Sequence, residues 1–86
     1  MSIEKDCQAI CARIIRLLRE ERQNQGLTKY VVAQRSGLSQ QAVGYMERGE
    51  KRPSLETILR YAAAIEVDFA DIVRRAQGEA SPKRGR

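Results

Sequence analysis

The chain has 86 residues, the size of one small domain, so an arrangement of two domains is excluded. The composition is 42% hydrophobic but only 5% aromatic, which is enough for a small core of aliphatic side chains and argues against a disordered chain. Lysine and arginine total 16 against 11 acidic residues, and the net charge of +5 favours polyanionic partners such as nucleic acid.

Several functional classes lack the residues they need. Histidine is absent, so we expect no enzyme and no metal or cofactor site. Cys7 and Cys11 are too few and too closely spaced to staple a secreted domain, and no apolar signal segment opens the chain. The longest apolar stretch, Tyr61–Ile65, is far shorter than the about 20 residues of a membrane span. We therefore expect a cytoplasmic protein with reduced thiols and no membrane partner.

The first predicted element is a long amphipathic helix from Ile3 to about Asn24. Its apolar residues recur at steps of three and four, with charged residues between them. These apolar positions are Ile3, Cys7, Ile10, Cys11, Ile14, Leu17 and Leu18. Gly26 follows as a helix stop.

Two short helices come next. Thr28 is placed to cap a helix from Lys29 to Ser36, and Ser39 is placed to cap a helix from Gln40 to Arg48. A glycine follows each of them, and only a tight turn lies between them.

The rest of the chain predicts two further helices and a tail. Ser54 opens a fourth helix with an apolar stripe, and Asp68 marks the acidic start of a short fifth helix. The apolar pattern ends at Ala76, so we divide the chain into a domain over residues 1–77 and a flexible basic tail over residues 78–86. No strand-like alternation occurs, and the fold class is therefore all-α with five helices.

The second and third helices, over residues 28–48, have the spacing of a helix-turn-helix, whose second helix can enter a DNA major groove. Further motifs fall in the same register: Gly26-Leu27-Thr28, Ala33, Ser36-Gly37-Leu38-Ser39-Gln40, Glu47-Arg48-Gly49 and Pro53-Ser54-Leu55. Together they resemble the Cro/C1 type of helix-turn-helix regulator, also called the XRE family, from about residue 14 to residue 73. The resemblance implies a compact five-helix, lambda-repressor-like DNA-binding domain, here with an extended first helix.

One face of the third helix is the candidate base-reading surface. At about 100° per residue, Val43 and Met46 face the core. The residues on the opposite face, which we expect to read bases, are Gln40, Gln41, Gly44 and Tyr45. Glutamine can donate and accept together, as a bidentate contact to adenine requires. The alternative is a solvated helix start with a tolerated glycine.

Phosphate contacts are expected at the starts of the second and third helices and beyond the end of the third, where amides and cations can meet the DNA backbone. The family also places backbone contacts there. The residues are Thr28, Lys29, Ser39, Arg48, Lys51 and Arg52. The alternative for Lys51 and Arg52 is an ordinary solvated loop.

The resemblance further implies a structural ion pair between Arg22 and Glu47. Removing one partner of a buried pair costs ~3 to 5 kcal/mol, because the other charge is left without compensation. The alternative is two unrelated surface charges.

The start of the chain departs from the family pattern. Glu21 lies near a position that is often leucine, and the first helix begins several turns before the shared core. Cys7 and Cys11 lie one turn apart on this extension, on the same face as Ile3 and Ile14, so we expect them to pack in the core or in an interface. A metal site would need further ligands from a second subunit, and redox control through these thiols is left open.

We therefore expect a sequence-specific DNA-binding transcriptional regulator, a repressor, that binds double-stranded DNA. Because one module makes few base contacts, it should act as a homodimer on half-sites one helical turn apart, about 34 Å. The dimer seam is expected at Phe69, Ile72 and Val73 of the fifth helix, as in restriction-modification controller proteins, or along the first helix. These residues could equally fill the monomer core. The alternative function is an antitoxin-like or protein-interaction module with the same fold.

Overall fold

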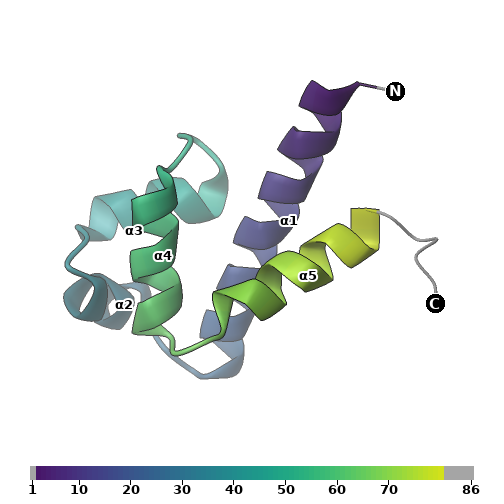
Figure 1. Ribbon diagram of the computed structural model, residues 1–86. Helices are drawn as coiled ribbons and strands as arrows, with labels where there is room; N and C mark the ends of the chain where they lie inside the picture. The colour runs from purple at the N-terminus through teal and green to yellow at the C-terminus, as the bar shows by residue number, and fades with distance from the viewer. Residues whose placement is uncertain (1, 81–86) are drawn as a thin grey trace.

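The structure, a computed structural model, describes residues 2–80, with side chains described for residues 2–78. Within this range the chain forms five α-helices and no strand, which confirms the all-α prediction. The helices are α1 (Ile3–Asn24), α2 (Lys29–Ser36), α3 (Gln40–Arg48), α4 (Leu55–Ala64) and α5 (Phe69–Ala80). α5 returns alongside α1, and α4 packs on α2 (Figure 1). No helix of the described part is long and apolar enough to cross a membrane.

The helix starts are fixed by capping side chains at the predicted positions. The Thr28 hydroxyl accepts a hydrogen bond from the Val31 amide at 3.1 Å, and the Ser39 hydroxyl accepts one from the Ala42 amide at 2.9 Å. Ser54 caps α4 in the same way. Each hydroxyl satisfies one of the amides that a helix start leaves without an internal partner.

The turn between α2 and α3 depends on a backbone conformation that favours glycine. Gly37 ends α2 with a φ of 78°, in the left-handed region. Its amide donates to the Ala33 carbonyl at 3.0 Å, which closes the end of α2 before the chain turns into α3. The tight turn of the predicted helix-turn-helix is therefore present.

The core lies where α1, α4 and α5 meet the α2–α3 pair. Its largest fully buried side chains are Tyr61, Leu18, Met46, Ile65, Ile72, Val32 and Val43. Each large apolar side chain removed from water contributes about 1.5–3 kcal/mol, so this cluster is the main stabilising element of a small domain. Leu38, in the turn between α2 and α3, lies at the edge of the cluster and is only partly buried.

Ile72, one of the residues expected at a dimer seam, lies in the monomer core, which is the alternative that the sequence left open. Ile72 is 1% exposed within a single chain, and Ala76 one turn later is also fully buried. α5 packs against α1, so the face of α5 that carries these two residues is used inside the monomer. Phe69 packs against the core with part of its surface exposed, and Val73 is half-buried.

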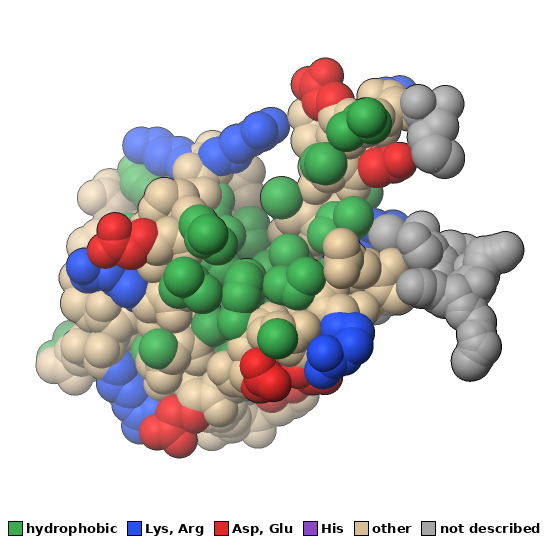
Figure 2. Space-filling model, in the orientation of Figure 1, with side chains coloured by type: hydrophobic (Ala, Val, Ile, Leu, Met, Phe, Trp, Pro, Cys, Tyr) green, Lys and Arg blue, Asp and Glu red, His purple; other side chains and the backbone are tan. Residues whose placement is uncertain are grey.

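Cys7 and Cys11 are not core residues. Both thiols are free and exposed, because the first turns of α1 extend past the other helices (Figures 1 and 2). The buried residues of α1 begin only at Leu17, and Ile3 is 81% exposed. The apolar periodicity correctly predicted the helix, but it did not reveal that Ile3, Cys7 and Cys11 stay exposed in the part of the chain that the structure describes.

α5 extends past residue 77, where the sequence predicted the end of the folded domain. It continues to Ala80, although Gln77 and Gly78 are exposed. A formed helix adds one backbone hydrogen bond for each residue by which it grows, so it can continue past the last apolar contact. The first three residues assigned to the basic tail are therefore helical, and residues 81–86 of that tail lie outside the described residues.

The position of Ile72 generates a stability prediction. Ile72→Ala should lower the free energy of unfolding by about 2–5 kcal/mol, since it opens a cavity in the core. Val73→Ala, on the neighbouring and partly exposed position, should cost clearly less. Urea unfolding of the two variants at equal protein concentration measures the difference. Equal losses of stability would place Ile72 outside the core.

Candidate nucleic-acid interface

α3 presents one buried and one exposed face. Val43 and Met46 are buried against the core, whereas Gln40 and Gln41 at the start of the helix are exposed. This division agrees with the helical wheel. Because α3 also packs on α2 and on α1, its exposed face is held in a fixed orientation.

The helical wheel placed Gly44 on the exposed face of α3, but the structure does not leave this position open. It is buried, and a Cβ added there would lie 3.0 Å from the Arg48 Nη1 atom. Arg48 follows one turn later, so its side chain reaches back over the glycine. Gly44 therefore makes room for the Arg48 guanidinium in this conformation, and contact between Gly44 and DNA requires that side chain to move.

Tyr45 links the exposed face of α3 to the loop that follows it. The Gln41 Nε2 atom donates to the Tyr45 hydroxyl at 2.9 Å. The Lys51 Nζ atom lies 4.5 Å from the centre of the Tyr45 ring, and the Arg48 guanidinium lies 5.6 Å from it. Both distances allow a cation–π interaction. One candidate base-reading residue, Gln41, and two candidate phosphate contacts thus interact with the same tyrosine side chain, the first through its hydroxyl and the other two through its ring.

Glu50 is a neighbour of this cluster that the sequence analysis did not consider. The Arg48 Nε atom donates to the Glu50 Oε2 atom at 2.7 Å. This hydrogen bond is the main cause that lowers the pKa of the Glu50 carboxyl and raises that of Arg48. Arg48 is exposed as predicted, but it is already paired with a carboxylate.

The remaining predicted phosphate contacts, Thr28, Lys29, Ser39, Lys51 and Arg52, are exposed. A hollow of about 230 Å³ lies between the ends of α1 and α3 and the start of α2. Its lining includes Lys29 and Arg48, and it also includes two residues that the sequence analysis missed, Arg19 and Gln23. Arg19 lies three positions before Arg22 and four before Gln23. This spacing was the available signal, since residues three and four apart share a helix face.

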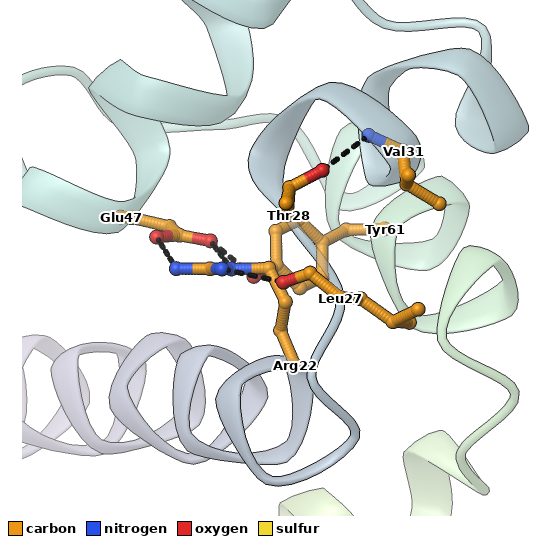
Figure 3. A network of polar contacts seen from close by, with 6 residues as sticks. All are labelled: Arg22, Leu27, Thr28, Val31, Glu47 and Tyr61. Atoms are coloured by element: carbon orange, nitrogen blue, oxygen red, sulfur yellow. Dashed lines mark hydrogen bonds and ion pairs between the residues drawn. The ribbon is translucent and has the colours of Figure 1, made fainter.

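The predicted pair between Arg22 and Glu47 is present and buried (Figure 3). The Arg22 Nε and Nη2 atoms donate to the two carboxylate oxygens of Glu47 at 2.7 and 2.9 Å. The two side chains are only 9% and 3% exposed. A third donor, Arg22 Nη1, meets the Leu27 carbonyl at 2.8 Å.

Tyr61 completes this network and was not predicted from the sequence. Its hydroxyl donates to the Glu47 Oε2 atom, so the carboxylate accepts from α1 and α4 together. Burial, followed by the hydrogen bond to Glu47, raises the pKa of Tyr61 well above its ordinary value. The hydrogen bond to Glu47 likewise raises the pKa of Arg22. The network ties the end of α3 to α1, to α4 and to the segment before α2.

The network gives a second stability prediction. Glu47→Ala should lower the free energy of unfolding by about 3–5 kcal/mol, because it leaves the Arg22 guanidinium buried without its partner. Tyr61→Phe should cost about 1–3 kcal/mol. Glu56→Ala, which breaks an exposed pair with Arg60, is the control and should change little. A small effect of Glu47→Ala in urea unfolding would mean that the pair does not support the fold.

The raised pKa of Tyr61 predicts a pH dependence. The folded state keeps the phenol proton at a pH where the unfolded state, with a tyrosine pKa of about 10, has begun to lose it. The phenol of Tyr61 therefore makes its full contribution to the free energy of unfolding below about pH 10, and this contribution is lost as pH rises beyond that value. The free energy of unfolding should fall more steeply with rising pH in the wild type than in Tyr61→Phe. Parallel profiles in alkaline urea titrations would contradict the buried phenol.

Comparison with known proteins agrees with this geometry. Residues 18–72 match the family model described as helix-turn-helix. The chain is 38% identical over 52 residues, 60% of its length, to the uncharacterized HTH-type transcriptional regulator y4dJ of Sinorhizobium fredii, of which the match covers 68%.

Two solved structures have the same fold. The restriction-modification controller protein C.AhdI from Aeromonas hydrophila superposes with a TM-score of 0.65 at 34% identity, over 72% of this chain and 94% of that one. A mutant of the restriction-modification controller protein C.Esp1396I superposes with a TM-score of 0.76 over 86% of this chain and 96% of that one, at 16% identity. From its motifs, its family match and its fold, the chain belongs to the Cro/C1-type helix-turn-helix family.

Proposed function

We propose that this chain is a cytoplasmic transcriptional repressor that binds a specific double-stranded DNA operator as a homodimer. The observation that carries the proposal is the exposed polar face of α3, held rigidly by the buried network and bordered by cations. An α-helix fits the major groove, and occupancy of an operator is itself enough to block transcription. The matched relative named as a transcriptional regulator supports the same class of function.

Base reading is assigned to the start of α3. Gln40 and Gln41 are exposed there, and each amide can donate to and accept from an adenine edge. Tyr45 is partly exposed and holds the Gln41 amide through its hydroxyl, so it orients that glutamine and can meet a thymine methyl or a phosphate. Gly44 contributes close approach once the Arg48 side chain has moved aside.

Phosphate contacts are assigned to the two helix starts and to the cations around them. Thr28 and Lys29 begin α2 and Ser39 begins α3, where the free amides and the helix dipole favour an anion. Arg48, Lys51 and Arg52 extend the positive surface beyond the end of α3. Arg19 adds to it, since it lines the same hollow as Lys29.

The dimer seam is assigned to α4 and α5. Apolar side chains gather on the face that these helices form (Figure 2). Leu55 is 63% and Leu59 is 44% exposed, and Phe69 and Val73 are partly exposed. An exposed apolar patch of this kind is typical of a protein interface. The same patch is the observation that favours the second candidate, an antitoxin-like or protein-interaction module, in which a different protein covers it.

DNA binding is tested by fluorescence-anisotropy titration at two salt concentrations, with duplexes selected from a random library. Gln40→Ala combined with Gln41→Ala should remove preference for the selected site, because each bidentate contact to a base contributes about 1–3 kcal/mol of discrimination. Lys51→Ala combined with Arg52→Ala should weaken binding to all duplexes and lower the salt slope by about 0.9 for each phosphate that the variant no longer neutralises.

Matched controls separate these effects from charge and folding. Arg74→Ala combined with Arg75→Ala removes two positive charges from α5 and should leave the affinity nearly unchanged. Gln77→Ala removes a glutamine outside the interface and should leave the preference for the selected site unchanged. A folded protein that binds no duplex at low salt would overturn the DNA-binding proposal and leave the protein-interaction module.

A further inference from the structure

A cleft of about 340 Å³ lies between the first half of α1 and the loop that joins α3 to α4. Cys7, Cys11 and Ile15 belong to the α1 wall, and Lys51 and Arg52 belong to the loop wall. The projecting start of α1, which forms one side, stands apart from the body of the molecule in Figure 2. The volume is at the lower end of the range for small-molecule sites.

Both cysteines of the chain line this cleft, and both are free and exposed. They lie one helical turn apart, which places their Cβ atoms about 5–6 Å from each other. A disulfide needs Cβ atoms about 3.5–4.5 Å apart, so the two thiols do not pair with each other while α1 is intact. Disulfide chemistry at this site therefore requires an external sulfur.

The lining of the cleft selects the kind of external molecule. Its walls are mostly apolar, from side chains such as Ala12, Ile15, Pro53 and Ile58. The loop side carries two cations, whereas the start of the α1 wall carries one carboxylate, that of Glu4, which accepts a hydrogen bond from Gln8. We propose that the cleft is a thiol-modification site at which Cys7 or Cys11 forms a mixed disulfide with a small thiol compound that carries a carboxylate. The apolar part of the adduct lies along the α1 wall, and its carboxylate faces Lys51 and Arg52.

The reaction is a thiol–disulfide exchange with a low-molecular-weight disulfide as the oxidant. The cysteine sulfur, after losing its proton, attacks one sulfur of the external disulfide. The external S–S bond breaks as the protein–S–S bond forms. The leaving sulfur takes the electron pair and a proton and departs as the free thiol. The protein sulfur is oxidised and the leaving sulfur is reduced, and an added thiol reverses the step.

The site regulates DNA binding in a way that rests on the proposed function. Lys51 and Arg52 are assigned there as phosphate contacts, so a carboxylate held beside them competes with the DNA backbone. Cys7 and Cys11 lie outside residues 18–72, which match the family model. The cysteine wall is thus an addition of this chain to the part of the domain that the family model matches.

The first test uses no DNA and compares two disulfide reagents, anionic dithiobis(nitrobenzoate) and uncharged dithiodipyridine. Released chromophore measures the rate of exchange with the intact, reduced protein. Lys51→Gln combined with Arg52→Gln should lower the ratio of the anionic to the uncharged rate at least about threefold at low salt. Arg74→Gln combined with Arg75→Gln should leave it unchanged. Equal ratios in the wild type and both double variants would overturn the anionic preference of the site.

The second test measures the DNA affinity of the modified protein. The carboxylated adduct should weaken binding about tenfold at about 0.1 M salt and lower the salt slope by about 0.9, as expected when one phosphate is no longer neutralised. The uncharged adduct should have a much smaller effect, and a reducing agent should restore binding. The variant that combines Cys7→Ser with Cys11→Ser should bind DNA with the affinity of the wild type, and neither reagent should change that affinity.

The outcomes separate the two proposals. Equal weakening by both adducts would overturn competition by charge, since bulk alone would then account for the effect. If the unmodified protein binds no duplex, the proposed DNA-binding function fails, and the rate comparison alone decides whether the cleft is a site for anionic disulfides. Single Cys7→Ser and Cys11→Ser variants then identify which thiol reacts with the anionic reagent.

Discussion

The carboxylate of Glu47 is the point on which the arrangement of the helices depends. It lies at the end of α3 and accepts from Arg22 of α1 and from Tyr61 of α4. A buried ion pair gains little net stability over apolar packing, so its value here lies in geometry. The forked guanidinium and the phenol satisfy the carboxylate only when the helices have one relative orientation, and that orientation exposes the polar face of α3.

The molecule has two parts with different roles, and the Glu47 network lies in only one of them. Residues 18–72 contain Arg22, Glu47 and Tyr61 together with most of the core, and they match the family model. The first turns of α1 lie outside that match and have little buried surface. The first part fixes how α3 is presented, whereas the second adds a wall beside the α3–α4 loop and contributes only partly buried side chains, such as Ile15, to the edge of the core. Chemistry on the second part can therefore change without altering the fold.

The features that the sequence predicted are mainly local ones. Thr28, Ser39 and Ser54 cap the helices they were expected to cap, because a cap depends on residues only a few positions away. The pairing of Arg22 with Glu47 came from the family resemblance, and Tyr61 was missed because a stripe of apolar residues does not reveal which hydroxyl finds a distant carboxylate. Ile72 and Cys7 show the same limit, since periodicity identifies an apolar face and tertiary packing decides what covers it. The cover that Arg48 forms over Gly44 depends on a side-chain conformation, which a helical wheel does not contain.

The ion pair between Arg48 and Glu50 has a consequence for how the surface meets a polyanion. Glu50 holds Arg48 at 2.7 Å, so in the DNA complex proposed above a phosphate contact of Arg48 requires the exchange of one anion for another. The exchange favours a closely placed phosphate that accepts two hydrogen bonds from Arg48 over a distant or weak anion. It also leaves the released Glu50 carboxylate facing the DNA backbone. Loose, non-specific encounters then gain little from Arg48, and its full contribution is reserved for the closely docked complex. If the chain binds DNA as proposed, an acidic residue within its basic surface thus sharpens the distinction between sliding along DNA and stopping at a site.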